Sequence, residues 1–260
     1  MIEKMEQIVL KAGELLLDQS LNGKKGHWEG TQFKAKADRL THHNLKQALQ
    51  DMDGAIPVIS EEDPMSLVHH RPKKYWLIDP IDGTASFAQG YSGFVTQVAL
   101  IENHQPIMAA IYAPKLDDLY VAVKGEGASL NGSKLKLRKS KEISSVIDNT
   151  PSPQGIAKAV YDHFSCSRYV ECGSIALKIC KVADGTADLF IKDVEVKDWD
   201  VAAPHLILEE AGGALTDIQG MAFNYKGPYK RDGVVASHSP IQGKKVIGWY
   251  KGEYREEQQN

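Results

Sequence analysis

The hydrophobic positions at the start of the chain follow helical spacing. Apolar residues recur three and four apart over residues 2–16, which predicts an amphipathic first helix. Glycines over residues 23–30 interrupt this pattern. We expect a second helix over about residues 41–54, because a threonine suited to an N-cap precedes it and an Asp-Gly pair ends it. Residues 56–60 then predict a short strand.

The pattern changes to β-branched and aromatic runs in the middle of the chain. These runs predict adjacent antiparallel strands over residues 94–100, 108–112 and 119–123. Residues 134–145 are polar and charged. We therefore expect a boundary there between an N-terminal part, residues 1–143, and a C-terminal part, residues 144–260.

The C-terminal part alternates between the two periodicities. Helices are expected over residues 156–163, 174–184 and 201–211, and strands over residues 187–191 and 214–217. The whole pattern predicts a mixed α+β or α/β fold, with an antiparallel sheet in the N-terminal part and a smaller α/β arrangement in the C-terminal part.

Composition and charge exclude some function classes. The 260 residues are 42% hydrophobic and 25% charged, with a net charge of −3, and lysine and arginine are scattered. A nucleic-acid-binding protein would gather them on one face, so no nucleic acid partner is expected. The three cysteines form no CxxC pair, and the first helix carries acidic residues. These features favour a reducing compartment and no membrane anchor, hence a cytoplasmic location.

The most informative motif follows a short apolar run over residues 75–78. That run predicts a strand buried on both faces, and the proline after Asp79 should make the chain turn. Asp79 and Asp82 would then repel each other unless a cation lies between them, and Mg²⁺ is common where phosphate is handled. Gly83 and Thr84 offer backbone N–H groups to an anion. Asp-Pro and Asp-Gly pairs also form plain turns, so the motif alone leaves both interpretations open.

Two other acidic positions lie at the ends of predicted elements. Glu61 follows the strand over residues 56–60, and Asp200 directly precedes the helix over residues 201–211. An aspartate at that place can also act as a simple helix cap.

Three motifs together resemble a known family: SEEDP at residues 60–64, WLIDPIDGT at 76–84, and WDVAA at 199–203 with EAGG at 210–213. They are similar to the signatures of the lithium-sensitive, Mg²⁺-dependent phosphomonoesterases typified by inositol monophosphatase. The resemblance covers nearly the whole chain. It implies a layered α-β-α-β-α sugar-phosphatase fold, phosphate ester hydrolysis and inhibition by Li⁺.

The resemblance also implies a role for each matching position. Glu61, Asp79 and the carbonyl of Ile81 would bind one Mg²⁺, and Asp79, Asp82 and Asp200 a second. Two cations about 3.5–4 Å apart can stabilise the attacking and leaving oxygens of an in-line displacement. Carboxylates suffice for Mg²⁺, so neither cysteine nor histidine is needed.

The same resemblance assigns the phosphate and the attacking water. The amides of Gly83 and Thr84 would hold the phosphate, while Glu61 and the Thr84 hydroxyl would position the water.

One position departs from the family pattern. The family's Thr-x-x-Asp segment supplies an acid near the water and a weak third metal position, but this chain has Asn44 there. A neutral amide cannot offset a third cation's charge, so we expect two Mg²⁺, at most a weak third, and reduced but surviving activity. The neighbouring His42 and His43 would point about 100° apart on a helix, which favours solvated or capping roles over metal binding.

The segment GSIALK at residues 173–178 resembles that of CysQ-type 3′(2′),5′-bisphosphate nucleotidases. Lys178 could meet a second phosphate as a point charge, and Lys192 could add another. Asp193 instead matches an acid that inositol-specific relatives use for sugar hydroxyls. The expected substrate contacts are Gly83, Thr84, Ser174, Lys178, Lys192, Asp193 and Asp200.

The sequence therefore predicts a small phosphorylated metabolite as the partner, first of all adenosine 3′,5′-bisphosphate, with inositol or sugar phosphates as the alternative. A monomer or homodimer is expected. Haloacid-dehalogenase-type phosphatases also contain Asp-Gly-Thr, but their two acids lie two residues apart, whereas Asp79 and Asp82 lie three apart. A non-catalytic Ca²⁺-binding or phosphate-sensing protein is the remaining alternative.

Overall fold

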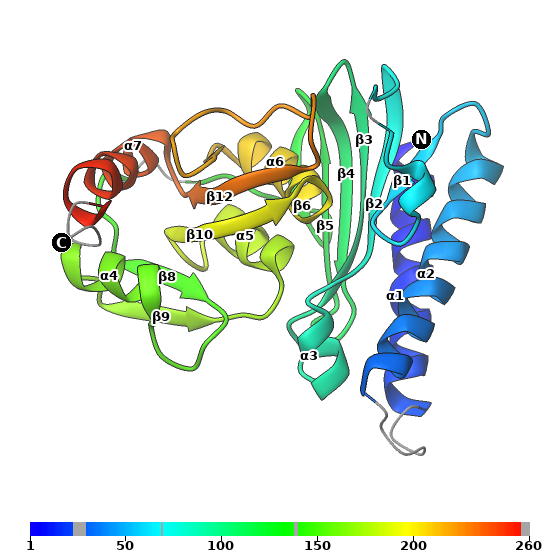
Figure 1. Ribbon diagram of the computed structural model, residues 1–260, viewed down its shortest axis with the longest axis horizontal. Coiled ribbons are helices and arrows are strands. Elements are labelled where there is room, and N and C mark those ends of the chain that lie inside the picture. The colour runs from blue at the N-terminus through cyan, green and yellow to red at the C-terminus, as the bar shows by residue number, and fades with distance from the viewer. Residues whose placement is uncertain (23–29, 69, 138–139, 256–260) are drawn as a thin grey trace.

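The computed structural model describes residues 1–22, 30–68, 70–137 and 140–255 (Figure 1). Its helices are α1 (Ile2–Asn22), α2 (Gly30–Met52), α3 (Thr84–Gln89), α4 (Gly155–His163), α5 (Ile175–Ala183), α6 (Asp198–Ala211) and α7 (Pro240–Trp249). Its strands are β1 (Val58–Ser60), β2 (Lys74–Asp82), β3 (Val95–Glu102), β4 (Gln105–Ala113), β5 (Asp118–Val123), β6 (Gly127–Leu130), β7 (Ser133–Lys134), β8 (Ser145–Asp148), β9 (Arg168–Glu171), β10 (Leu189–Lys197), β11 (Ala214–Thr216) and β12 (Lys230–Ser237).

The first sheet contains seven strands in sequence order, from β1 to β7. β1 and β2 are parallel, and the pairs from β2 onward are antiparallel. The predicted antiparallel strands are thus confirmed as β3, β4 and β5. Helices α1 and α2 cover one face of this sheet, and α6 packs on β4, β5 and β6 of the other (Figure 1).

The second sheet contains five strands in the order β11-β12-β10-β8-β9. Helices α4 and α7 cover one face of it, while α5 and α6 lie between the two sheets (Figure 1). The molecule therefore has five layers, α-β-α-β-α, which confirms the predicted fold class.

The largest hydrophobic cluster joins both sheets. It includes Ala109 and Ala122 of the first sheet, Leu206 and Ile207 of α6, and Val234 of the second sheet. Because α6 is apolar on nearly its whole circumference, it can bury side chains against both sheets at once. The division of the chain into residues 1–143 and 144–260 stays a prediction.

Several element boundaries differ from those expected, and two of these differences lie near the acidic motifs. Helix α2 begins at Gly30, eleven residues before the expected start, and Thr41 is buried in its middle. The glycine-rich break falls mostly in residues 23–29, which lie outside the described residues. Strand β2 continues through Pro80 to Asp82, because its pairing with β3 shifts register between Asp79 and Asp82. Such an irregularity accommodates a residue that cannot donate a ladder hydrogen bond.

None of the helices within the described residues is long and apolar enough to cross a membrane. Cys166, Cys172 and Cys180 are free thiols, and Cys166 and Cys180 are buried.

Candidate active site

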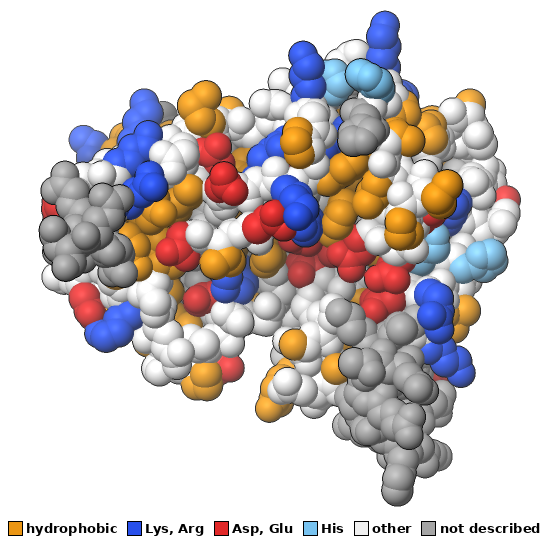
Figure 2. All heavy atoms as spheres, viewed as in Figure 1, with side chains coloured by type: hydrophobic (Ala, Val, Ile, Leu, Met, Phe, Trp, Pro, Cys, Tyr) orange, Lys and Arg blue, Asp and Glu red, His pale blue; other side chains and the backbone are white. Residues whose placement is uncertain are grey.

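Three acidic side chains from distant parts of the sequence meet between the two sheets. Glu61 follows β1, Asp79 lies near the end of β2, and Asp200 is the third residue of α6. One carboxylate oxygen from each lies within 4.8 Å of the others. Acidic side chains accordingly gather in the central hollow of the molecular surface (Figure 2).

The buried acids raise one another's pKa. Asp79 is 2% exposed, and its pKa lies well above the ordinary value because burial disfavours the charge and Glu61, Asp82 and Asp200 repel it. Burial and the charge of Asp82 likewise hold the pKa of Asp200 well above the ordinary value. Hard carboxylate oxygens packed this closely fit a divalent cation such as Mg²⁺, which would relieve the repulsion.

Asp82 is fixed by the start of α5. Its Oδ2 accepts hydrogen bonds from the Ser174 hydroxyl and from the Ala176 backbone N–H, both at 2.6 Å. Burial is the larger influence and raises the pKa of Asp82, while these two bonds lower it. Ser174 also accepts a bond from the Leu177 N–H and so acts as the N-cap of α5. It is fully buried, and its hydroxyl serves Asp82; contact with a substrate stays a prediction.

The turn after β2 requires a glycine. Gly83 has a φ of 86°, and a Cβ there would lie 2.5 Å from the Gly93 carbonyl oxygen. Beside it the Thr84 hydroxyl donates to the Ile81 carbonyl at 3.4 Å, and the Ile81 N–H donates to Asp79 Oδ1 at 3.0 Å. These bonds hold the turn in one conformation, and its predicted roles in metal and phosphate binding stay predictions.

Asp200 caps its helix in a different way from the one expected. The N-cap residue of α6 is Lys197. Asp200 lies three residues after it, and the Asp200 carboxylate accepts a hydrogen bond from the Lys197 backbone N–H at 2.8 Å. The local alternative, a plain cap, is therefore partly true. It leaves the placement of Asp200 beside Glu61 and Asp79 unexplained.

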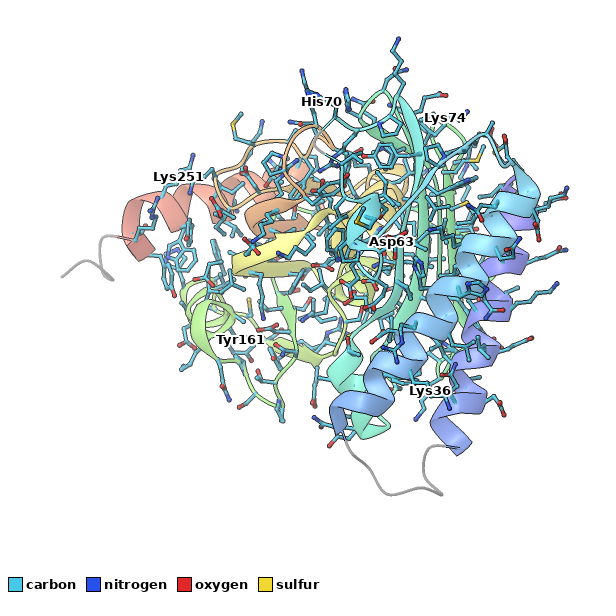
Figure 3. All side chains as sticks on the ribbon, turned by 45° about the vertical axis from the view of Figure 1, so that its right-hand side comes forward. Lys36, Asp63, His70, Lys74, Tyr161 and Lys251 are labelled. Carbon is cyan, nitrogen blue, oxygen red and sulfur yellow. The ribbon has the colours of Figure 1, made fainter. Side chains whose placement is uncertain are left out.

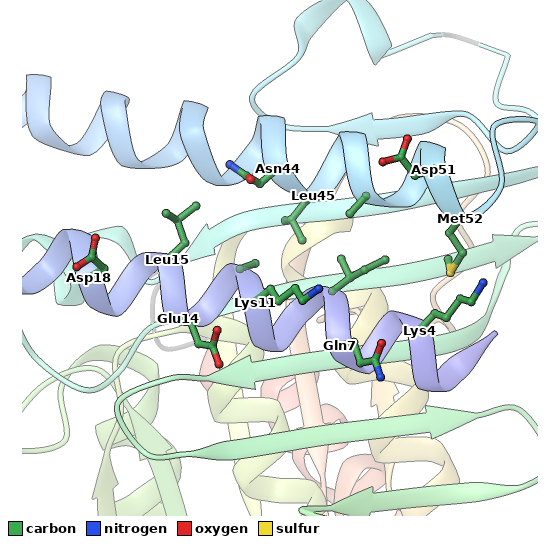
Figure 4. A pocket seen from close by; sticks show the side chains of 13 residues that line it. Lys4, Gln7, Lys11, Glu14, Leu15, Asp18, Asn44, Leu45, Asp51 and Met52 are labelled. Atoms are coloured by element: carbon green, nitrogen blue, oxygen red, sulfur yellow. The ribbon is translucent and has the colours of Figure 1, made fainter.

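Asn44 is expected from the family pattern to lie near the attacking water, but its side chain is exposed. The structure corrects this: its side chain donates to the Leu40 carbonyl at 2.8 Å and lines a groove of about 680 Å³ between α1 and α2 (Figure 4). Sequence reasoning missed Asp38, a 2% exposed residue of α2 whose charge adds to the raised pKa of Asp79. Extending the helix upstream would have found it, because Asp38 lies three residues before the buried Thr41.

The two adjacent histidines behave differently from each other. His42 is half-buried, and its Nδ1 lies 2.8 Å from the hydroxyl of Ser60, the residue before Glu61. A solvated or capping role is therefore wrong for His42, whereas His43 is exposed as expected. Next to this contact, Lys46 of α2 pairs with Asp63 at 2.7 Å, and Figure 3 shows Asp63 on the turn in front of the sheets.

A second charged cluster lies where α5 packs on the second sheet. Lys178 is only 1% exposed, and its Nζ lies 3.3 Å from Asp148 Oδ1 and 4.8 Å from the Phe190 ring centroid. Burial lowers the pKa of Lys178. Lys192 is more exposed, and its Nζ lies 3.7 Å from the same Asp148 oxygen. Asp193 is exposed beside it. Asp148 belongs to no motif that sequence reasoning identified.

A cavity of about 810 Å³ opens beside the turn at Gly83. It is lined by residues from segments that connect the strands of each sheet. They include Gly83, Ser86, Tyr91, Asn149, Glu171 and Gly173. This volume is ample for a small phosphorylated metabolite.

Comparison with known proteins agrees with this geometry. The family model described as "Inositol monophosphatase family" matches residues 1–249. The 3′(2′),5′-bisphosphate nucleotidase CysQ of Salmonella typhimurium is 29% identical over 232 residues, which are 86% of this chain and 94% of that protein. A fructose-1,6-bisphosphatase/inositol-1-monophosphatase of Aquifex aeolicus is 30% identical over 71% of this chain and 72% of its own length.

Among solved structures, inositol monophosphatase II from Staphylococcus aureus has a TM-score of 0.82 at 19% identity and covers 97% of this chain and 95% of its own. This likeness shows the shared fold. The family and the curated relatives support a phosphatase, a hydrolase of phosphate esters. With the motifs, the five layers and the acidic cluster in agreement, the chain belongs to the inositol monophosphatase family.

Proposed function

We propose that the protein is a Mg²⁺-dependent 3′(2′),5′-bisphosphate nucleotidase that hydrolyses adenosine 3′,5′-bisphosphate to AMP and phosphate. The observation that carries the proposal is the pairing of two features: the acidic trio Glu61, Asp79 and Asp200, and the two lysines of α5 and β10 that lie near Asp148. The CysQ relative, which aligns along most of both chains, supports the same substrate class.

The acidic residues are the proposed ligands of two Mg²⁺ ions. Glu61, Asp79 and the Ile81 carbonyl would hold one Mg²⁺, and Asp79, Asp82 and Asp200 would hold a second. Bound Mg²⁺ supplies charge for the phosphate oxygens and lowers the pKa of a water.

The protein's own donors and acceptors orient the reactants. The Gly83 and Thr84 amides donate to phosphate oxygens, while the Glu61 carboxylate and the Thr84 hydroxyl hold the attacking water in line with the leaving oxygen. The reaction needs no covalent aspartyl-phosphate.

The lysine cluster supplies the second-phosphate site. Two lysines and one carboxylate, Lys178, Lys192 and Asp148, leave a net positive charge. Lys178 is buried and acts mainly by neutralising Asp148, so the more exposed Lys192 meets the phosphate that stays on the product.

A substrate pair tests this assignment. Lys192→Ala should raise KM for adenosine 3′,5′-bisphosphate by roughly tenfold, the worth of one charge-assisted contact, and leave KM for adenosine 3′-monophosphate unchanged. Lys158→Ala, which removes a lysine exposed on α4, is the matched control. An equal rise for both nucleotides, or no rise for either, would reject the second-phosphate site.

Asp193 favours a second candidate, hydrolysis of inositol or sugar phosphates. Its exposed carboxylate can accept hydrogen bonds from sugar hydroxyls. The Aquifex relative carries such an activity in its name. If this candidate is right, Asp193→Ala will raise KM for inositol 1-phosphate, and that ester will be turned over faster than the nucleotide bisphosphate.

A further inference from the structure

A buried ion pair ties the beginning of β2 to the beginning of α6. Arg71 lies three residues before β2, and its Nη2 is 2.6 Å from Oδ2 of Asp198, the first residue of α6. The two side chains are 1% and 0% exposed. The pair thus joins the two elements that carry Asp79 and Asp200.

The guanidinium of Arg71 is held from several sides. Its partners besides Asp198 are the Tyr75 hydroxyl at 3.1 Å, the carbonyls of Tyr225, Gly227 and Pro228 at 3.0, 2.8 and 2.9 Å, and the Tyr229 ring centroid at 3.8 Å. A planar group with this many fixed contacts has one orientation. Arg71 is therefore a rigid anchor for whatever it holds.

The position of Asp198 determines where Asp200 lies, because both belong to the first turn of α6. The Asp198 N–H donates to the Tyr229 carbonyl at 2.9 Å, and its side chain meets Arg71, so the first residue of α6 is fixed at both its backbone and its carboxylate. Two residues on, Asp200 accepts the Lys197 N–H. Pro204 has no N–H to give the Asp200 carbonyl, so the first turn of α6 lacks one of its own helical bonds. Outside contacts then decide where that turn lies.

A buried ion pair adds little net stability over apolar residues of the same size, because desolvating both charges is costly. Its value lies in fixing one geometry. We propose that Arg71 and Asp198 are positioning residues that hold Asp200 against Glu61 and Asp79 and so set the affinity of the metal site. This inference rests on the metal site in the proposed function.

A second ion pair in the molecule provides a matched control. Lys181 of α5 lies 2.9 Å from Asp118 of β5, so this pair also links a helix to the first sheet. The second ion-pair partner of Lys181 is Asp184, at the end of α5, and neither partner is a predicted metal ligand. Asp118→Asn removes the carboxylate of this pair. It should lower the stability of the fold without moving a metal ligand.

The experiment measures Mg²⁺ binding calorimetrically on metal-stripped protein, together with thermal unfolding in EDTA. Asp198→Asn should weaken Mg²⁺ binding by roughly 10–100-fold, as losses of residues that orient metal ligands do. Asp118→Asn should bind Mg²⁺ like the wild type. Asp198→Glu, which restores the charge, should recover part of the affinity.

The positioning role is overturned if Asp198→Asn unfolds at a lower temperature but binds Mg²⁺ like the wild type, or if Asp118→Asn weakens binding equally. Should Asp198→Asn fail to fold, Arg71→Lys serves as the second variant, because it keeps the positive charge but loses the planar guanidinium. Unchanged Mg²⁺ affinity of Arg71→Lys would also overturn the positioning role. Wild-type protein that binds no Mg²⁺ would instead refute the metal site itself.

Discussion

The acidic trio and the Arg71–Asp198 pair each contain a buried carboxylate, Asp79 in the first and Asp198 in the second, but the charges next to these two carboxylates have opposite signs. At Asp79 the neighbouring charges add to the effect of burial, and all of them raise its pKa. At Asp198 burial also raises the pKa, but Arg71 and Arg231 oppose it. A folded protein keeps like charges together only where something else compensates them. The first cluster therefore indicates a binding site, and the second a structural anchor.

The largest expected effect comes from breaking the anchor. Arg71→Met should lower the free energy of unfolding by roughly 3–5 kcal/mol, because it leaves the buried Asp198 carboxylate with only Arg231 as a cationic partner, at 3.8 Å. Chemical denaturation in EDTA measures this loss. If unfolding is unchanged, Asp198 is not held by Arg71, and the contrast between the two clusters disappears.

Neutralising one member of the acidic trio should lower activity but stabilise the metal-free protein, whereas breaking the ion pair destabilises it. Asp79→Asn should lower phosphate release by at least about 100-fold. It should also raise the unfolding temperature in EDTA, because one of several repelling charges is gone and the Ile81 N–H keeps an acceptor. A variant that folds well but stays fully active would favour the non-catalytic alternative for this cluster.

The stability of the metal-free protein should depend on pH through the acidic trio. The pKa values of Asp79 and Asp200 are raised in the folded protein, so above the ordinary carboxylate pKa the folded state binds more protons than the unfolded state. The metal-free protein should therefore lose stability as the pH rises from the ordinary carboxylate pKa of about 4 to the raised pKa values of the folded protein. Mg²⁺ displaces these protons, so its affinity should increase over the same range.

Thermal unfolding in EDTA and in Mg²⁺ measures this effect. Added Mg²⁺ should flatten the decline, and Asp79→Asn should reduce it in EDTA. A decline that neither change affects would place the responsible groups outside the trio.

The smallest effect is expected at Asp38. Asp38→Asn removes a like charge near Asp79 without removing a predicted ligand, so Mg²⁺ affinity should fall by about tenfold at most. Asn44→Asp, on the exposed face of α2, should leave affinity unchanged and serves as the control. A larger effect at position 44 than at position 38 would show that α2 presents a different face to the site.

Much of this site could be predicted because its residues lie in short, continuous motifs. The turn from Asp79 to Thr84 is local, and Glu61 and Asp200 each stand at an element's end. What the sequence could not give depends on contacts between distant segments. Asp148 meets Lys178 across 30 residues, and Arg71 meets Tyr225 across 154.

The error at Asn44 has a local cause. Placing the start of α2 at Thr41 hid the helical face that contains Asp38, and matching by position in sequence then assigned the acid's place to an outward-facing amide. Likewise, the register shift that lets β2 run through Pro80 depends on pairing with β3, which a single strand's sequence does not reveal.

The decisive measurement is phosphate release from adenosine 3′,5′-bisphosphate, followed in purified wild-type protein as Mg²⁺ is titrated into a metal-stripped sample. We expect no release in EDTA, release that saturates with Mg²⁺, and slower turnover of inositol 1-phosphate and fructose 1,6-bisphosphate. Equal release in EDTA, or no Mg²⁺-dependent release from any of these esters, would contradict the proposed function.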